Sequence, residues 1–234
     1  MRNWKLKNGY TIFQVLILRS NCFLISCPNG NILVDTGIQG SRTRLMKNIK
    51  SLNLANSKID FLILTHSHFD HCRNARYLQE NENCKIIMSE NEAEYARTGY
   101  TTLPEGTIQL TKLVSVLGNM IGEKGFGFDV FNPDILVKEN LSLIKSGFDI
   151  EIIATPGHSI GSLSVIVNNE IAIVGDTMFG VFRNSIFPPF ADNTRELIAS
   201  WKKILNTGCY LFLPGHGTAI KRELVKSELE VFIE

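Results

Sequence analysis

The sequence lacks an excess of charge of either sign. Its 24 basic and 23 acidic residues give a formal net charge of +1 and are spread along the whole chain. A protein that binds nucleic acid normally presents a strongly basic face, because contacts with phosphate supply much of its affinity. The even charge balance therefore predicts no nucleic-acid partner and argues against a nuclease.

Long apolar runs are also missing. A membrane-spanning helix needs about 20 consecutive apolar residues, and a secretion signal needs an apolar stretch followed by small residues at a cleavage site. The first apolar run, residues 10–18, is short and contains Thr11 and Gln14. We therefore expect no membrane association and a cytoplasmic location.

Cysteines are few and form no CxxC pair. Their number is odd and their spacing irregular, which fits a reduced intracellular chain better than a disulfide framework. Cys72 adjoins the histidine-rich segment described below, and we expect it to pack as a small apolar residue on a helix. The five are Cys22, Cys27, Cys72, Cys84 and Cys209.

The order of the apolar patterns predicts an α/β fold. In the first half, β-rich runs are followed by an amphipathic helical pattern and a short buried strand. They lie at residues 10–18, 22–26, 31–34, 41–54 and 61–64. In the second half, a strand series precedes two helices with one strand between them. These lie at residues 141–144, 150–154, 162–167, 171–174, 194–205, 210–213 and 220–232.

Two sheet-forming halves, each followed by helices, predict a four-layer αβ/βα sandwich. A chain of 234 residues with 44% hydrophobic residues is long enough to form it as one domain, residues 1–234. Between the halves, residues 99–134 are rich in glycine. They fit either a mobile lid over a site or an irregular but ordered excursion on the surface.

Three of the five histidines fall within residues 66–71, whose sequence is HSHFDH. A six-residue window of this chain holds about 0.1 histidine by simple proportion. In an extended loop His66 and His68 can point the same way, while Asp70 and His71 turn away as the next helix begins. Imidazole and carboxylate ligands suit zinc or iron. This segment is therefore predicted to provide ligands to two metal ions.

The other two histidines, His158 and His216, each follow an apolar strand in a Pro-Gly turn. Loops at strand ends often display catalytic groups, so the shared context favours metal binding over a structural role. Asp35 and Asp176 also follow apolar strands. Taken alone, each aspartate fits a turn-capping role equally well.

In this order the segments resemble the motifs of the metallo-β-lactamase superfamily, and the resemblance covers most of the chain. It implies one metal held by His66, His68 and His158. It implies a second metal held by Asp70, His71 and His216, with Asp176 bridging the two. Asp35 is expected to order the histidine loop without binding metal, as outer contacts of metal ligands commonly do.

The resemblance implies two divalent ions per chain, with zinc preferred and iron or manganese as alternatives. Water between the two cations would lose a proton near neutral pH and attack, while one metal polarises the substrate oxygen. Asp70 would act as a catalytic residue by orienting that hydroxide through its second oxygen. The substrate is expected to be a small molecule, and the sequence specifies no oligomeric state.

Residues 155–159 and 175–179 most resemble the glyoxalase II-like branch, whose members hydrolyse thioesters. Two features argue against a hydroxyacylglutathione hydrolase itself. The chain ends 18 residues after His216, too early for a C-terminal glutathione-binding domain, and residues 72–74 replace the usual Gly-Gly pair. An exported β-lactamase is not expected, because those enzymes lack this aspartate bridge. The expected reaction is hydrolysis of an ester-type bond, in a thioester or a lactone.

Two alternatives remain open. A mononuclear iron persulfide dioxygenase of the same fold would use the equivalents of His66, His158 and Asp176, and a small-phosphodiester hydrolase would use both metals. For substrate contacts, Phe179 belongs to an aromatic and proline-rich stretch that fits either a pocket wall or ordinary core. Arg183 fits either a contact with an anionic substrate group or a solvated side chain.

Overall fold

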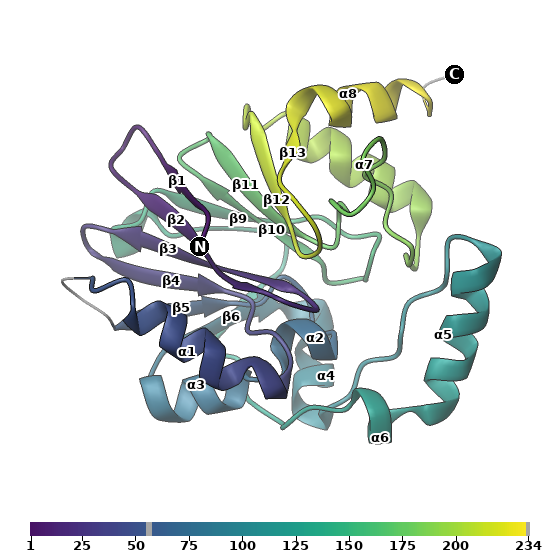
Figure 1. The fold of residues 1–234 in the computed structure, drawn as a ribbon, viewed down its shortest axis with the longest axis horizontal. Coiled ribbons are helices and arrows are strands. Elements are labelled where there is room, and N and C mark those ends of the chain that lie inside the picture. The colour runs from purple at the N-terminus through teal and green to yellow at the C-terminus, as the bar shows by residue number, and fades with distance from the viewer. Residues whose placement is uncertain (55–57, 233–234) are drawn as a thin grey trace.

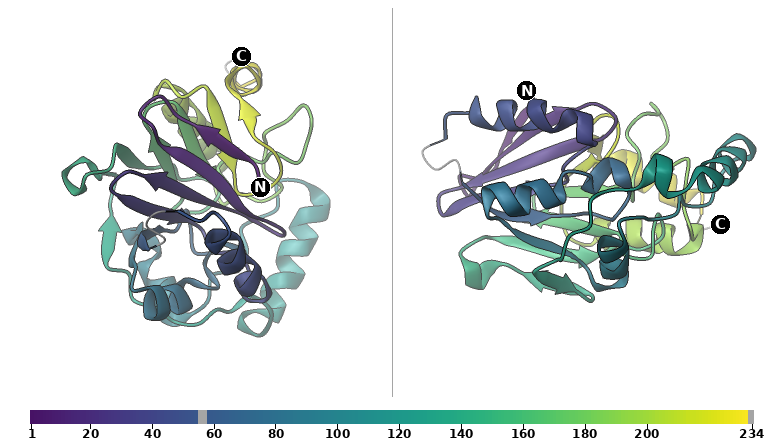
Figure 2. Two further views of the ribbon diagram at one scale, coloured as in Figure 1. Left: turned by 60° about the vertical axis from the view of Figure 1, so that its left-hand side comes forward. Right: turned by 90° about the horizontal axis from the view of Figure 1, so that it is seen from below.

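The computed structural model describes residues 1–54 and 58–232. Two β-sheets face each other, and helices cover their outer faces (Figures 1 and 2). The first sheet holds seven strands in the order β1 to β7, and the second holds six in the order β13-β12-β11-β10-β9-β8. This arrangement confirms the four-layer αβ/βα sandwich.

The first sheet is antiparallel from β1 to β4 and parallel from β4 to β7. Its strands are β1 (Asn3–Lys5), β2 (Thr11–Ile17), β3 (Asn21–Cys27), β4 (Gly30–Val34), β5 (Ile59–Ile63), β6 (Lys85–Ser89) and β7 (Ile135–Val137). The second sheet is antiparallel except for the pair β11 and β12. Its strands are β8 (Asn140–Ser142), β9 (Ile150–Ala154), β10 (Leu163–Val167), β11 (Ile171–Gly175), β12 (Leu211–Pro214) and β13 (Ile220–Lys221).

Helices α1 and α3 pack on the first sheet, while α7 and α8 pack on the second (Figure 1). The helices are α1 (Arg42–Lys50), α2 (Phe69–Cys72), α3 (Ala75–Glu82), α4 (Ala93–Thr98), α5 (Gln109–Ile121), α6 (Glu123–Phe126), α7 (Thr194–Leu205) and α8 (Arg222–Glu230). Within the described residues, no helix combines the length and apolarity needed to cross a membrane.

Three apolar clusters correspond to the three boundaries between the layers. The first fills the space between the sheets with residues such as Ile12, Phe23 and Val165. The second joins the first sheet to its helices through Leu45, and the third centres on Trp201 of α7. Each fully buried aliphatic or aromatic side chain of this kind contributes about 1.5–3 kcal/mol. Close packing on both faces of each sheet therefore holds the strand ends in fixed positions.

The glycine-rich segment is more regular than the sequence indicates. Residues 99–134 contain the 13-residue helix α5 and the short helix α6. Of the glycines there, Gly106 and Gly122 lie outside α5, and Gly118 occupies its buried face, where a side chain would clash with Leu103. The glycine content suggests an irregular segment, but these glycines lie near the ends of the helix or at its one close contact with Leu103.

Two predicted elements have different boundaries in the structure. Strand β8 covers Asn140–Ser142, and the rest of predicted strand 141–144 turns into a short 3-10 helix, Ile144–Ser146. Predicted helix 220–232 begins only at Arg222, because Ile220 pairs with Phe212 at the sheet edge. At the first place local turn hydrogen bonds, from Ser146 N–H to the Leu143 carbonyl and from Gly147 N–H to the Ile144 carbonyl, end the strand. At the second place pairing with β12 replaces the first turn of the predicted helix.

Candidate metal centre

All the predicted metal ligands lie at one edge of the sandwich, at the carboxyl ends of strands. Strands β4 and β5 are parallel, as are β11 and β12. Strand β9 has the same direction as β11, because each pairs antiparallel with β10. The loops that follow these five strands carry the histidines and aspartates, so the sheet topology brings residues distant in sequence together.

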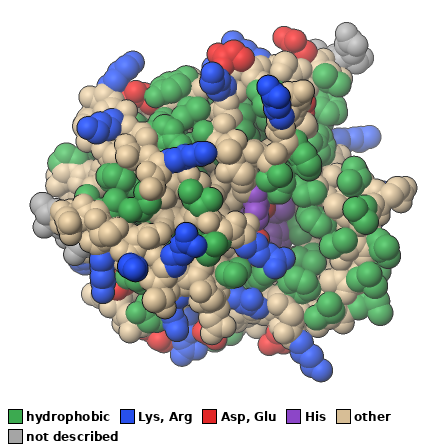
Figure 3. Space-filling view, viewed as in Figure 1, with side chains coloured by type: hydrophobic (Ala, Val, Ile, Leu, Met, Phe, Trp, Pro, Cys, Tyr) green, Lys and Arg blue, Asp and Glu red, His purple; other side chains and the backbone are tan. Residues whose placement is uncertain are grey.

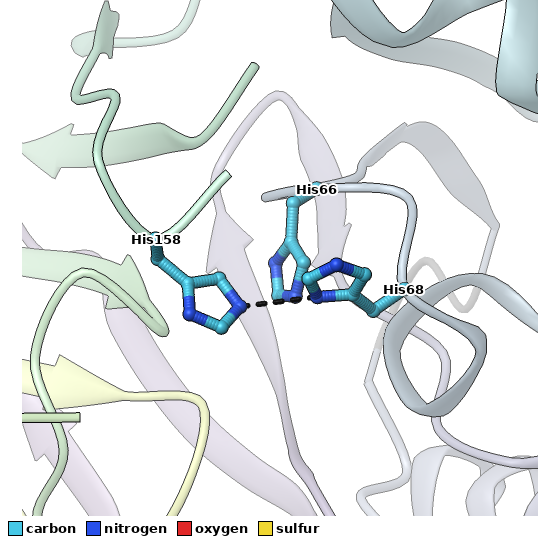
Figure 4. Close-up of side chains that lie close together, drawn as sticks. All are labelled: His66, His68 and His158. Atoms are coloured by element: carbon cyan, nitrogen blue, oxygen red, sulfur yellow. Dashed lines mark hydrogen bonds between the residues drawn. The ribbon is translucent and has the colours of Figure 1, made fainter. Parts of the chain in front are cut away.

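The first ligand group consists of His66, His68 and His158, which approach one another from two loops (Figure 4). His68 Nδ1 lies 3.0 Å from His158 Nε2, and one nitrogen of each ring lies within 4.8 Å of the others. Zinc with nitrogen ligands at about 2.0–2.1 Å places those ligands roughly 3.4 Å apart in a tetrahedral site. The spacing therefore suits one metal ion.

The outer nitrogens of two of these rings, His158 and His66, are held so that their inner nitrogens face the centre. His158 Nδ1 donates to the Phe190 carbonyl at 2.9 Å, which leaves Nε2 as the nitrogen available to bind a metal. His66 Nδ1 lies 3.0 Å from Thr65 Oγ1. His66 Nε2 is buried and has no hydrogen-bond partner among the described residues. A buried imidazole nitrogen without a partner fits a metal ligand, because its isolation otherwise costs free energy.

The second ligand group consists of Asp70, His71 and His216. Asp70 and His71 lie in the short helix α2, and His216 lies in the turn after β12. His216 Nε2 is 3.4 Å from His71 Nε2 and 3.6 Å from Asp70 Oδ2. This group also suits one metal ion with imidazole and carboxylate ligands.

Asp176 lies between the two groups. Its Oδ1 is 3.4 Å from His71 Nε2, and its Oδ2 is 3.1 Å from His216 Nε2 and 3.7 Å from His158 Nε2. Like His66 Nε2, Asp176 Oδ1 is buried without a hydrogen-bond partner among the described residues. Gly215 makes the approach possible, because a Cβ there would lie 2.2 Å from Asp176 Oδ1.

Asp35 lies beneath the cluster and contacts a histidine of the second group. It accepts hydrogen bonds from the Thr65 backbone N–H at 2.9 Å and from His71 Nδ1 at 2.9 Å. Its backbone has φ of 60°, a left-handed conformation that aspartate tolerates better than most residues. These contacts keep the Nδ1–H of His71 toward Asp35 and attach the histidine loop to the end of β4.

The two ligand groups differ in how readily they are protonated. Burial and neighbouring histidines hold the pKa of His66 and of His68 well below the usual range. Burial acts in the same direction on His71, but the carboxylates of Asp176 and Asp35 outweigh it and raise its pKa to about 10. The pKa of His216 is also raised: burial lowers it, but the Asp176 carboxylate outweighs burial.

This difference predicts a stepwise loss of metal as the pH falls. A metal at Asp70, His71 and His216 must displace protons, since the pKa values of both histidines lie above their usual value. His66 and His68 stay neutral to lower pH, so protons compete less at the first group. With an ion in each group, dialysis from about pH 8 to about pH 5, followed by metal analysis, should remove the ion at the second group before the ion at the first. Simultaneous loss, or unchanged content, would contradict this assignment.

Glu92 joins the two loops of the first ligand group. It is completely buried at the start of α4, and its Oε2 accepts from the Ser67 backbone N–H at 2.6 Å. Its Oε1 accepts from Ser159 Oγ at 2.5 Å and from the Gly161 backbone N–H at 3.1 Å. Ser67 lies between His66 and His68, and Ser159 follows His158, so one carboxylate sets the distance between the two loops.

Replacing Glu92 with Gln should weaken metal binding at the first group by about 10–100-fold, the usual cost of losing an outer contact of metal ligands. The amide N–H₂ of Gln cannot accept, so one of the two loops loses its hydrogen bond. Competition with a chromophoric chelator measures the affinity. Glu94→Gln is the matched control, because Glu94 is exposed two residues away. Equal affinity in the two variants would show that Glu92 does not position the loops.

A cavity of about 360 Å³ opens above the ligand groups, a size typical of small-molecule sites. His68, Asp70, His158, Asp176 and His216 form its floor. Its walls are mainly apolar and include Phe69, Leu103, Pro104, Phe126, Phe179 and Phe190. Figure 3 shows the histidines in a hollow bordered by hydrophobic side chains. Val114 of α5 and Phe126 of α6 both contribute to the lining of the cavity.

The structure separates the two predicted substrate-contact residues. Phe179 lines the cavity, whereas Arg183 lines a different hollow beside Phe182 and Lys221. Arg19 lines the cavity instead: its Nε is 3.9 Å from Asp70 Oδ2, and its guanidinium lies 4.8 Å from the centre of the Phe69 ring. In the sequence, nothing marks Arg19 beyond a charge at the end of an apolar run. Sheet pairing brings it to the site.

Comparisons with known proteins agree with this geometry. A sequence model of the metallo-beta-lactamase superfamily matches residues 17–216. A probable metallo-hydrolase of Methanocaldococcus jannaschii is 30% identical over 85% of this chain and 87% of its own length. Hydroxyacylglutathione hydrolase GloC of Haemophilus influenzae is 30% identical over 88% of this chain and 90% of its own length.

Solved structures show the same fold. A subclass B3 metallo-beta-lactamase of Bradyrhizobium japonicum has a TM-score of 0.67 at 18% identity, covering 100% of this chain and 92% of that one. The two-sheet fold, the cluster of histidines and aspartates, and the related metallo-hydrolases together define a metal-dependent hydrolase. The chain belongs to the metallo-beta-lactamase superfamily, and its motifs are closest to those of the glyoxalase II-like branch.

The short segment after His216 predicts a difference from hydroxyacylglutathione hydrolases. This chain nevertheless aligns with 90% of the length of a relative that carries that name. The length of the segment after His216 therefore does not distinguish this chain from a protein of that name.

Proposed function

We propose that the chain hydrolyses an ester-type bond of a small molecule with two divalent metal ions, zinc in preference to iron or manganese. The observation that carries the proposal is the position of Asp176, whose carboxylate lies within 3.7 Å of His158 in one group and 3.4 Å of His71 in the other. One carboxylate between two groups of three donors suits a pair of ions. When bound, such a pair supplies an activated water and polarises the substrate oxygen.

The residues of the chain would hold the reactants in place. Asp70 uses Oδ2 toward His216 at 3.6 Å, which leaves its other oxygen to accept a hydrogen bond from the attacking water. Asp35 keeps His71 in the tautomer whose Nε2 faces the centre, through the 2.9 Å contact at Nδ1. With a substrate in the cavity, the apolar walls and the substrate together would exclude bulk water from the reacting bond, which strengthens the electrostatic contacts of the centre.

The cavity lining favours a carbonyl ester with an apolar acyl or aromatic group. Among the described lining residues Arg19 alone carries a permanent positive charge, and it is more than half exposed. A phosphodiester hydrolase would be expected to hold its substrate with more cationic side chains. The relative named as a hydroxyacylglutathione hydrolase supports a thioester over a lactone.

A hydrolysis panel on zinc-loaded protein tests this proposal, with thioesters, lactones, phosphodiesters and cephalosporins compared by kcat/KM. We expect the highest kcat/KM for thioesters and the next highest for lactones. Val114→Asp should raise KM for substrates with apolar acyl groups, because Val114 lines the cavity. Val181→Asp, at an exposed position in the separate hollow, should not. A preference for phosphodiesters, or no ester hydrolysis at all, would refute the proposal.

The persulfide dioxygenase alternative would require only His66, His158 and Asp176. In this chain Asp70, His71 and His216 also have ligand atoms within 4.8 Å of one another. A complete second group favours the two-metal hydrolase over a single iron centre.

A further inference from the structure

Helix α5 turns its apolar side toward solvent and its polar side toward the rest of the chain. Its buried positions are Ser115 and Gly118. A surface helix normally has the opposite pattern, because apolar side chains stabilise a protein when they leave water. Six apolar side chains of α5 are each more than half exposed, and we call them the outer face: Leu110, Leu113, Val116, Leu117, Met120 and Ile121. Helix α5 stands at the right of Figure 1, and hydrophobic side chains gather on that side in Figure 3.

The polar side of α5 is fixed against the preceding segment, so the helix cannot turn its apolar side inward without breaking contacts. Ser115 Oγ donates to the Pro104 carbonyl at 2.7 Å, and the Leu103 backbone N–H donates to Asn119 Oδ1 at 2.8 Å. At Gly118, a Cβ would lie 2.3 Å from Leu103, so the helix and this segment are in close contact.

Both ends of the α5 region are attached to the body of the protein. Before α5, the Thr107 backbone N–H donates to the Pro189 carbonyl at 2.9 Å. After it, Arg73 donates to the carbonyls of Gly125 and Gly127 at 3.0 and 2.8 Å. The outer face therefore stays exposed as long as the chain is alone.

The outer face is large enough for a stable protein contact. Six side chains that are each more than half exposed present on the order of 700 Å², compared with the roughly 800 Å² that each partner contributes to a standard interface. Apolar patches on monomeric proteins rarely exceed a few hundred Å² without a binding role. A ligand in the cavity would not cover this surface, because none of the six side chains lines the cavity.

We propose that the outer face of α5 packs against the same face of a second copy of this chain, around a two-fold axis. The six side chains carry no charge, so pairing the face with itself brings no like charges together. Lys112, beside the face, is already paired with Glu105 at 3.7 Å. An anionic lipid surface would call for a cluster of basic side chains beside the apolar face. Helices α5 and α6 carry only Lys112 and Lys124, and this favours the second copy.

Light scattering coupled to size-exclusion chromatography tests the proposal on the full chain at micromolar concentration. The expected mass is twice that of one chain, and Leu113→Glu combined with Leu117→Glu should reduce it to that of one chain. Ile144→Glu is the matched control and should leave the mass doubled, because Ile144 is a similarly exposed apolar residue outside α5. Circular dichroism and the melting temperature establish that each variant is folded.

Crosslinking locates the contact. Leu117→Cys with a bifunctional maleimide should give a covalent dimer, while Ile144→Cys and the parent chain should not, since the native cysteines are buried or half-buried. A parent chain with the mass of one copy would overturn the proposal, as would a double variant that stays dimeric. Cosedimentation of single copies with phosphatidylcholine or phosphatidylserine vesicles would assign the outer face to a lipid surface instead.

Discussion

Replacing Asp176 with Asn should lower kcat/KM for ester-type hydrolysis by more than about 100-fold and leave at most one tightly bound metal per chain. Loss of an outer contact alone costs 10–100-fold in affinity or activity, and Asp176 lies directly among the donor atoms of both groups. Asn keeps the volume of the side chain but replaces one carboxylate oxygen with an N–H₂ that cannot bind a metal.

The matched control is Asp129→Asn, because Asp129 is an exposed aspartate outside the cavity lining. It should keep full activity and the metal content of the parent chain. Atomic emission spectrometry of dialysed samples gives the metal content, and initial rates give kcat/KM. An Asp176→Asn variant with two tightly bound ions and near-parent activity would show that the bridge assignment is wrong.

Removing the metal should abolish hydrolysis and lower the melting temperature by about 10 °C. Ligand present at about 1,000 times its dissociation constant stabilises a protein by about 4 kcal/mol, and each kcal/mol shifts the melting temperature of a chain of this size by about 2–4 °C. Without metal, His66 Nε2 and Asp176 Oδ1 are buried and lack hydrogen-bond partners among the described residues. Their desolvation is then uncompensated.

Dialysis against a chelator, followed by differential scanning calorimetry and rate measurements, checks this prediction. Zinc added back should restore both the melting temperature and the rate, and magnesium should not, because Mg²⁺ prefers oxygen ligands. If activity survived complete metal removal, the cluster would not be the reaction centre.

The sequence predicts the layers and the ligand cluster because both depend on local signals. Apolar runs of strand length mark the sheets, and the HSHFDH segment concentrates three histidines and an acid in one loop. The parallel strand directions then bring His158, Asp176 and His216 to the same edge. Taken alone, Asp176 and Asp35 each fit an ordinary turn aspartate equally well. The order of the motifs assigns them roles at a metal centre, and their distances to His71 place both beside the cluster.

The remainder depends on contacts that no local pattern contains. Glu92 contacts Ser67 and Ser159, which are 25 and 67 positions away in sequence. In sequence it resembles an acid on a solvated helix. Arg19 contacts Asp70 across the fold, whereas Arg183, the cation nearest the aromatic stretch, lies in a separate hollow. No local pattern shows either that the apolar side of α5 faces outward.

The central claim is that two metal ions act together in hydrolysis, and metal content measured with the reaction tests it most directly. Protein purified without added metal is analysed for zinc, iron and manganese, then assayed for thioester hydrolysis and for oxygen uptake with a persulfide. We expect two zinc ions per chain, thioester hydrolysis and no oxygen uptake. One iron per chain with persulfide-dependent oxygen uptake would contradict the claim and assign the centre to oxidation.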